Sequence, residues 1–271
     1  MHLDACVAIV ARLAAVLAGA VPTVFAAPEA VAPGRGWSGQ GDAIHAVLGE
    51  AIVEGLHDKG FALVPAGSGL GDVELQGLLR PFGEPYHEAT PVMEVRPDPQ
   101  AKFVANMQTG LEFHHECAYM PQPPRLLALY CRKNAAGGGN LLLCDADKVM
   151  AGLNSSTMEA LRSTLFVNTN TPQASPMPLL RPMPLLQGRE RFIFSAIGMS
   201  SGNCYFRPAL GFEDVGARLL AELKIRFEHC PEPETIAWHP GDLLVLDNLR
   251  IMHGRREIHG SERELAHLRI K

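Results

Sequence analysis

Short runs of apolar residues, separated by proline, glycine and polar residues, make up most of the chain after Gly60. Such runs have the length of β-strands and are too short for typical helices. The run Leu243–Leu246 contains no polar position, so we expect a strand that is buried on both faces. We expect further strands at Phe61–Val64, Phe103–Ala105, Arg125–Cys131, Leu141–Leu143, Phe166–Asn168, Phe192–Phe194 and Thr235–Trp238.

Helical periodicity is confined to a few segments. Apolar residues recur every three or four positions in Ile44–Leu56, after Asp42, which can cap a helix, and before Gly60, which suits the position just past its end. We also expect helices over Val73–Leu79, Ala146–Leu153 and Glu213–His229. Short strands, long excursions and a few flanking helices predict a mainly β, α+β fold of the jelly-roll or double-stranded β-helix type.

The first 41 residues have a different character. Val7–Val21 is apolar and rich in alanine. A signal peptide would have Lys or Arg before such a run, and none is present here. The run is also too short and too interrupted to span a membrane. Pro28–Gly41 is rich in proline, glycine and alanine, which predicts a linker. We expect a packed helix or dispensable leader and a linker over residues 1–41, followed by a single domain over residues 42–271. A cytoplasmic location is favoured over export.

Composition narrows the class of protein. The chain has 271 residues, of which 47% are hydrophobic, and its 29 acidic and 24 basic residues give a net charge of −5. Because Lys and Arg form no cluster, nucleic acid is not an expected partner, and neither is a membrane. The six cysteines are widely spaced and form no Cys-x-x-Cys pair, so we expect reduced thiols rather than a zinc site or a disulfide scaffold.

The candidate chemistry lies in Phe113-His114-His115-Glu116 and, far downstream, in Asp247–Gly254. In an extended strand, residues two apart share a face, so His114 and Glu116 can converge while His115 points away. Adding His253 gives two imidazoles and a carboxylate, the ligand set of the facial triad in non-haem Fe(II) oxygenases.

Two alternative metal sites remain open. A slip of one residue would make His115 the ligand, although Cys117 would then be its partner. Glu257 and His259 could form a local site near His253, but the sequence offers no evident third ligand for it.

Three blocks resemble a known family. Phe113–Tyr119, Gly138–Leu141 and Trp238–Arg255 resemble, in order and spacing, the taurine dioxygenase superfamily of Fe(II)/2-oxoglutarate enzymes, and within it the clavaminate synthase-like branch that hydroxylates amino acids. The resemblance implies Fe(II) as cofactor, with 2-oxoglutarate and O₂ as cosubstrates, and release of succinate and CO₂. Glu116 argues against the halogenases of this superfamily, which have glycine or alanine at the carboxylate position.

The resemblance also suggests how 2-oxoglutarate is bound. The family places an arginine after the distal histidine, often in a pair four residues apart, to hold the distal carboxylate. Arg263 matches the first member, but His267 stands four positions later and Arg269 two beyond it. Arg263 and Arg269 are therefore both candidates, with His267 as a helper. Asn140 replaces the family's threonine after the double glycine, and its amide could donate to the same carboxylate.

Substrate contacts are less well defined by the sequence. Arg207 lies in a segment that resembles a substrate-facing part of the branch and could bind a substrate carboxylate. Gln108, Thr109, Tyr119 and Asp247 could line the pocket, although Asp247-Asn248 could instead tie down a strand end. The resemblance favours a small-molecule substrate, an amino acid or derivative. Alternatives are desaturation, cyclisation or epimerisation at the same iron centre, and a non-catalytic metal-binding β-barrel or sensor.

Overall fold

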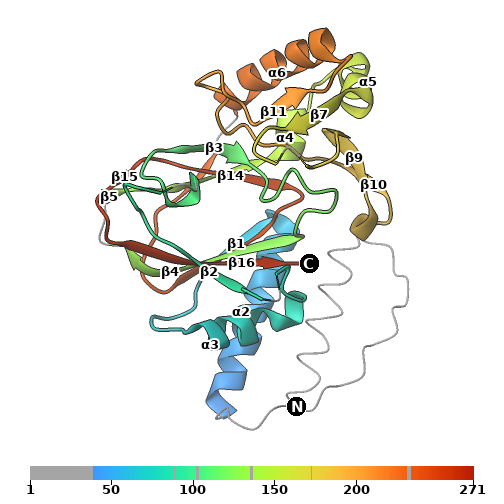
Figure 1. Ribbon diagram of the computed structural model, residues 1–271. Helices are drawn as coiled ribbons and strands as arrows, with labels where there is room; N and C mark the ends of the chain where they lie inside the picture. Colours follow the sequence, from blue (N-terminus) through green and yellow to red (C-terminus); the bar gives the residue numbers. More distant parts are fainter. Residues whose placement is uncertain (1–38, 88, 102–103, 135–136, 172, 231–232) are drawn as a thin grey trace.

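Two antiparallel sheets form the body of the protein (Figure 1). The computed structural model describes residues 39–271 except 88, 102–103, 135–136, 172 and 231–232, so the predicted leader and most of the predicted linker lie outside the described residues. The larger sheet contains, in order, β1 (Phe61–Pro65), β13 (Asp242–Asp247), β4 (Leu126–Asn134), β16 (Arg263–Ile270) and β2 (Val92–Val95). The smaller contains β12 (Glu234–Ile236), β6 (Leu141–Asp145), β14 (Ile251–Arg255) and β3 (Leu111–His114).

The core between these sheets explains the unbroken apolar strands. Leu244 and Leu246 of β13 pack in the cluster between the sheets, together with Trp238. Leu243 and Val245 point to the opposite face and pack under the helices. The strand is therefore buried on both faces, as its sequence predicts.

Helices α2 (Gly39–Asp58) and α3 (Asp72–Leu79) cover the outer face of the larger sheet (Figure 1). Both were expected from periodicity, although α2 begins at Gly39, before the predicted cap Asp42. The short 3₁₀ helix η1 (Arg80–Phe82) follows α3, and Gly83 caps its C-terminal end. Within the described residues, no helix is both long and apolar enough to cross a membrane.

A long excursion between β6 and β12 forms a second layer beyond the smaller sheet (Figure 1). It has its own core, in which Phe194 and Phe227 stack at 5.8 Å between ring centroids. Its helices and strands are α4 (Ala146–Met150), α5 (Ser155–Ser163), β7 (Leu165–Asn168), β8 (Met177–Pro178), β9 (Leu180–Met183), η3 (Pro184–Leu186), β10 (Arg189–Phe192), β11 (Phe206–Pro208) and α6 (Glu213–Glu228).

Two of these elements differ from the prediction. The helix predicted over Ala146–Leu153 ends at Met150, and a second helix, α5, follows it. The side chain of Asn154 caps α5 by accepting a hydrogen bond from the backbone of Thr157, a signal that the sequence contains. The strand predicted over Phe192–Phe194 ends at Phe192, and beyond it Ser195 forms an isolated antiparallel bridge with His114.

Other sequence-based expectations are corrected elsewhere in the chain. The strand predicted at Phe103–Ala105 is wrong, since Val104–Asn106 forms a short 3₁₀ helix, η2; Phe103 itself lies outside the described residues. A further two-stranded ladder joins β15 (Ile258–His259) to β5 (Gly137–Gly138), which begins the glycine turn Gly137–Gly139 before Asn140.

The expectation of uniformly reduced cysteines is also wrong. Cys144, at the end of β6, and Cys230, just after α6, form a disulfide. They are 86 positions apart in the sequence, so their spacing carried no local signal, and only the packing of α6 brings them together. Cys117, Cys131 and Cys204 are free thiols in the described chain.

Candidate metal centre

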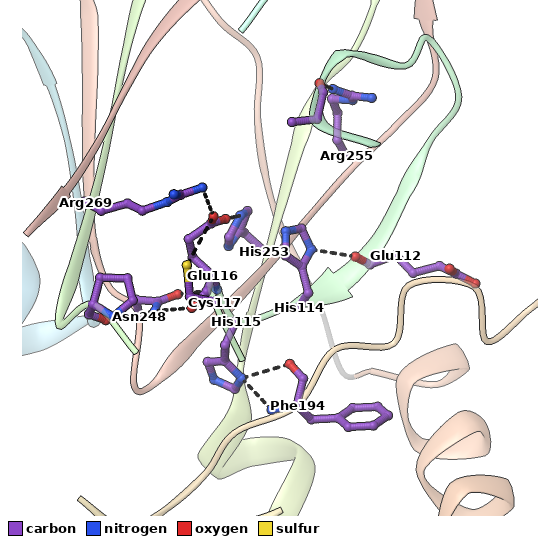
Figure 2. Close-up of polar contacts among 12 residues, drawn as sticks. Glu112, His114, His115, Glu116, Cys117, Phe194, Asn248, His253, Arg255 and Arg269 are labelled. Carbon is purple, nitrogen blue, oxygen red and sulfur yellow. Dashed lines mark hydrogen bonds and ion pairs between the residues drawn. The ribbon is translucent and has the colours of Figure 1, made fainter. Parts of the chain in front are cut away.

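The three predicted metal ligands converge on one point (Figure 2). His114 ends β3 and lies opposite His253 of β14 in the ladder, with 4.2 Å between ring centroids. The Oε2 atom of Glu116 lies 4.0 Å from Nε2 of His253. One ligand atom from each residue lies within 4.8 Å of the other two, and this is the only such group of His, Cys, Asp and Glu in the described chain.

The route by which Glu116 arrives differs from the expected one. Strand β3 ends at His114, and Glu116 lies in the following turn rather than in an extended strand. The next residue, Cys117, has a φ of 54°, in the left-handed region that non-glycine residues rarely adopt. Tertiary contacts hold this turn, so the carboxylate faces the imidazoles although the strand has already ended.

Both imidazoles are buried in the form that can bind a metal. Nδ1 of His114 donates to the carbonyl oxygen of Glu112 at 2.9 Å, which leaves Nε2 available. Nδ1 of His253 is buried and has no hydrogen-bond partner among the described residues. Burial lowers the pKa of His114, and burial together with the neighbouring His114 lowers that of His253 well below its usual value. Neutral imidazoles are the form that metal ligation requires.

Glu116 is held ionised by neighbouring cations. Burial alone would raise its pKa, but His267 and Arg269 lower it, and it lies at about 2. Because burial lowers the pKa of His267 to about 4, Arg269 is the cation that remains charged near neutral pH. Nη2 of Arg269 lies 2.5 Å from Oε1 of Glu116, on the side away from the imidazoles (Figure 2).

His115 points away from this group, as alternation along a strand predicts (Figure 2). Its Nδ1 accepts a hydrogen bond from the backbone N–H of Phe194 at 3.2 Å, and burial lowers its pKa to about 3. The slipped register with His115 as ligand is therefore not the arrangement present. Glu257 and His259 do not gather with a third ligand in the described chain.

Arg263 lies in a different setting from Arg269. Its side chain is 3% exposed, and Nε and Nη1 have no hydrogen-bond partner among the described residues. A Cβ on Gly139 would lie 2.5 Å from Nη1, so the guanidinium packs against the glycine turn that precedes Asn140. Burial, with a smaller effect from Arg255, lowers the pKa of Arg263 to about 10, which still leaves it charged at neutral pH.

Three of the predicted substrate residues lie in two segments, Tyr119 in one and Gln108 with Thr109 in the other. Tyr119 lies in the turn with Cys117, close enough to Arg269 to feel its charge, and burial followed by Cys117 raises its pKa to about 12. Gln108, which immediately precedes Thr109, donates from Nε2 to the carbonyl oxygen of Gly260 at 3.0 Å.

Asp247 and Arg207 make no described side-chain contact with the triad. Oδ2 of Asp247 lies 3.5 Å from Nη2 of Arg125, and Oδ1 accepts from the backbone N–H of Leu249 at 2.9 Å, so this side chain ties down the end of β13. Arg207 is exposed on β11, in the small sheet with β7 and β8, and no described contact joins it to the triad.

Three residues were not singled out from the sequence as parts of the site. Glu112 accepts from His114 through its carbonyl, and its carboxylate accepts from the backbone N–H of Ser200 at 2.7 Å. Arg255 donates to the carbonyls of Ala105 and Thr109, at 2.7 and 2.9 Å, and so holds the segment beside Gln108. Asn248 contacts the backbone of Glu116. Proximity to the motifs was the only sequence signal for them.

Two imidazoles and a carboxylate inside a double-stranded β-helix define the class of mononuclear non-haem iron oxygenases. The sequence profile described as "Taurine catabolism dioxygenase TauD, TfdA family" matches residues 30–269, and the chain belongs to this family. The family confirms the expected enzyme class, an iron- and 2-oxoglutarate-dependent oxygenase. No curated protein matches the chain.

Solved structures of similar fold support the architecture. An asparagine oxygenase in complex with Fe(II), 3-hydroxyasparagine and succinate is 19% identical, with a TM-score of 0.63 over 84% of this chain and 82% of that one. PvcB from Pseudomonas aeruginosa is 19% identical, with a TM-score of 0.62 over 79% and 77%. The non-haem iron oxygenase OrfP, with Fe and α-ketoglutaric acid, is 16% identical, with a TM-score of 0.62 over 85% and 80%. At these identities the likeness establishes the fold.

Proposed function

We propose that this protein is an Fe(II)- and 2-oxoglutarate-dependent dioxygenase that hydroxylates an unactivated C–H bond of an amino acid or similar small carboxylate. Succinate and CO₂ are the coproducts. The observation that carries the proposal is the convergence of His114, Glu116 and His253, with ligand atoms within 4.8 Å of one another. His253 Nδ1 is buried and has no partner in the part of the chain that the structure describes, and the donor set of two neutral imidazoles and one carboxylate fits Fe(II).

The chain's own residues have distinct tasks in this reaction. The iron, when bound, supplies the site at which 2-oxoglutarate and O₂ are activated for C–H oxidation. Glu112 fixes the tautomer of His114 and thereby directs Nε2 into the site. Arg269 keeps Glu116 deprotonated and fixes the orientation of its carboxylate. His115, through its hydrogen bond with the backbone of Phe194, ties the motif segment to the apolar core beyond the smaller sheet.

The distal carboxylate of 2-oxoglutarate is assigned to Arg263. Support comes from its buried guanidinium, whose Nε and Nη1 have no hydrogen-bond partner among the described residues, because buried donors of a charged group call for an anionic acceptor. Asn140, at the turn against which Arg263 packs, supplies a further amide donor. Arg269 is the second candidate, but its Nη2 already contacts Glu116.

The substrate class follows from the structural relatives. The asparagine oxygenase structure contains 3-hydroxyasparagine, and an OrfP variant contains (3S)-hydroxy-L-arginine, so both hold hydroxylated amino acids. Tyr119, Gln108 and Thr109 are the pocket residues that we propose for this chain, while Asp247 contacts Arg125 and Arg207 lies exposed on β11. Desaturation, cyclisation or epimerisation at the same centre is the second candidate outcome, and a non-catalytic metal-binding sensor is the third.

An anaerobic titration of the Fe(II)-loaded protein with 2-oxoglutarate tests the proposal. We expect a saturable visible charge-transfer band that is absent in Glu116→Ala and His253→Ala, and succinate formation in air. His239→Ala is the matched control, because that imidazole is 80% exposed and lies outside the triad. A band of full intensity in His253→Ala would refute the triad. Metal binding without a band or succinate would favour the sensor.

Location and domain organisation are further proposals. We keep a single catalytic domain over residues 42–271 and a cytoplasmic location, although a disulfide such as Cys144–Cys230 is more typical of oxidising compartments. Cell fractionation combined with alkylation of free thiols tests the location. A chain recovered outside the cytoplasm with Cys144 and Cys230 protected from alkylation would replace the cytoplasmic assignment with export.

A further inference from the structure

Asn248 holds both backbone polar groups of Glu116 with one side chain (Figure 2). The N–H of Glu116 donates to Oδ1 of Asn248 at 2.7 Å, and Nδ2 of Asn248 donates to the carbonyl of Glu116 at 3.1 Å. The same Nδ2 donates to the carbonyl of Pro124 at 2.9 Å. Asn248 is 0% exposed, so these bonds form without competition from water.

This contact replaces a β-ladder at the point where the ladder stops. Strand β3 ends at His114, so no strand among the described residues pairs with the N–H and C=O groups of Glu116. An asparagine amide offers a donor and an acceptor side by side, so it can bond both the backbone N–H and the backbone C=O of a single residue. The Glu116 turn is therefore fixed by a side chain rather than by strand pairing.

The anchor itself is rigidly placed. The backbone N–H of Asn248 donates to the carbonyl of Arg125 at 2.9 Å, and the neighbouring Asp247 lies 3.5 Å from the guanidinium of the same arginine. Asn248 lies between β13 and β14, and β14 then carries His253. One turn thus connects the strand that holds His253 to the backbone of Glu116.

We propose that Asn248 is a positioning residue of the metal centre: by holding the backbone of Glu116, it sets the place of the carboxylate relative to His253. The inference rests on the proposed function, because it assumes that the triad binds a metal. It adds a residue that touches no substrate and acts through Glu116. Partners that orient metal ligands typically change metal affinity about 10- to 100-fold when they are replaced.

The substitutions Asn248→Asp and Asn248→Ser separate positioning from general stability. Aspartate keeps the acceptor for the Glu116 N–H but cannot donate to either carbonyl, whereas serine is shorter and carries no charge. Asn168→Ala is the matched control. Asn168 is 7% exposed and accepts from the backbone of Asn170 at 3.0 Å, so it is also a buried asparagine in a backbone hydrogen bond, but on β7.

The experiment is an anaerobic Co(II) titration of the full-length protein, followed by its visible absorption, with near-UV circular dichroism and the melting temperature measured on the same samples. We expect Co(II) to bind about 10- to 100-fold more weakly to both Asn248 variants. At saturation, their spectra should shift toward that of Glu116→Ala. Asn168→Ala should lose melting temperature but keep the wild-type affinity and spectrum.

Failure of the Asn248 inference and failure of the triad assignment give different results. If the Asn248 variants keep a dissociation constant within twofold of wild type and an unchanged spectrum, while their melting temperature falls as in Asn168→Ala, Asn248 is only structural and the inference is overturned. If Co(II) binding to the wild type does not depend on Glu116 or His253, the triad assignment fails first.

Discussion

Arg269 donates from Nη2 to Oε1 of Glu116 at 2.5 Å, so a guanidinium lies directly against the carboxylate of the candidate metal triad. Both side chains are largely buried, at 18% and 15% exposure, so solvent screens the pair less than a surface ion pair. The carboxylate therefore carries a full negative charge that is already partly compensated before any metal binds.

Removing this compensation should change metal affinity. In Arg269→Gln the approaching divalent cation no longer meets a neighbouring positive charge, so we expect M²⁺ to bind more tightly, by about tenfold or less. The glutamine amide can still donate to Glu116, which preserves its orientation. Competition with a metal-binding dye, at two salt concentrations, measures the effect. Weaker binding in the variant would show that orientation by Arg269 outweighs its repulsion of the metal.

Arg263 should control the affinity for 2-oxoglutarate. In Arg263→Gln the distal carboxylate loses its charged partner, which costs about 2–3 kcal/mol, or about 30- to 150-fold in the half-saturating concentration. Arg263→Lys should restore only part of this, because lysine cannot form the paired contact. The comparison with Arg269→Gln is decisive for the cosubstrate role. If Arg269→Gln lost more affinity for 2-oxoglutarate than Arg263→Gln, the distal carboxylate would be assigned to Arg269.

Gly139→Ala should disturb Arg263 without touching the triad. Gly139 has a φ of 68°, and an added Cβ would lie 2.5 Å from Nη1 of Arg263. Gly188→Ala is the control, since Gly188 has a φ of 81° with no atom within 4 Å of an added Cβ. Both variants should lose about 1–2 kcal/mol of stability from the left-handed backbone. Only Gly139→Ala should also raise the half-saturating 2-oxoglutarate concentration; an equal effect in both would remove Arg263 from the explanation.

The disulfide should stabilise the layer formed by the residues between β6 and β12. Cys230→Ser, or reduction of the wild type, should lower the free energy of unfolding by about 2–5 kcal/mol, because the bond between Cys144 and Cys230 closes a long loop. Cys204→Ser is the control, as that thiol is free and only half-buried. Urea unfolding measures stability, and peptide mapping without reductant identifies the bond. Free thiols at both positions in the native protein would contradict the pairing.

Acid should destabilise the protein through His115. Its pKa lies at about 3 in the folded state and near 6.5 in the unfolded state, so the unfolded chain binds more protons between these values. The contribution to stability is fully present above pH 6.5 and is lost as the pH falls toward 3. At pH 5 the loss amounts to about 2 kcal/mol.

The substitution His115→Asn isolates this effect. The Oδ1 atom of asparagine takes the place of Nδ1 and can still accept from the N–H of Phe194, but it does not titrate. Urea unfolding at pH 7.5 and pH 5 should show a decrease in stability that is about 2 kcal/mol smaller in the variant than in the wild type. Equal decreases would mean that His115 is accessible to protons in the folded state.

Much of the architecture was encoded locally. The unbroken apolar run Leu243–Leu246 predicted a strand buried on both faces, and periodicity located the helix at Val73–Leu79. The motif residues His114, Glu116 and His253 could be proposed as one site because their types match a known ligand set. These features depend on residues close together in the sequence, or on motifs whose order identifies the family.

The tertiary structure decided how distant segments meet. No local pattern distinguished Arg263 from Arg269, since both are arginines of the same strand. Two nitrogens of Arg263 are buried without a partner among the described residues, whereas Arg269 pairs with Glu116. Likewise, only the packed fold joined Cys144 to Cys230 and left Arg207 exposed on a separate sheet. The physical reason is that pairing, burial and charge depend on the environment of each side chain. Sequence determined which groups could form the site, and the fold determined their partners.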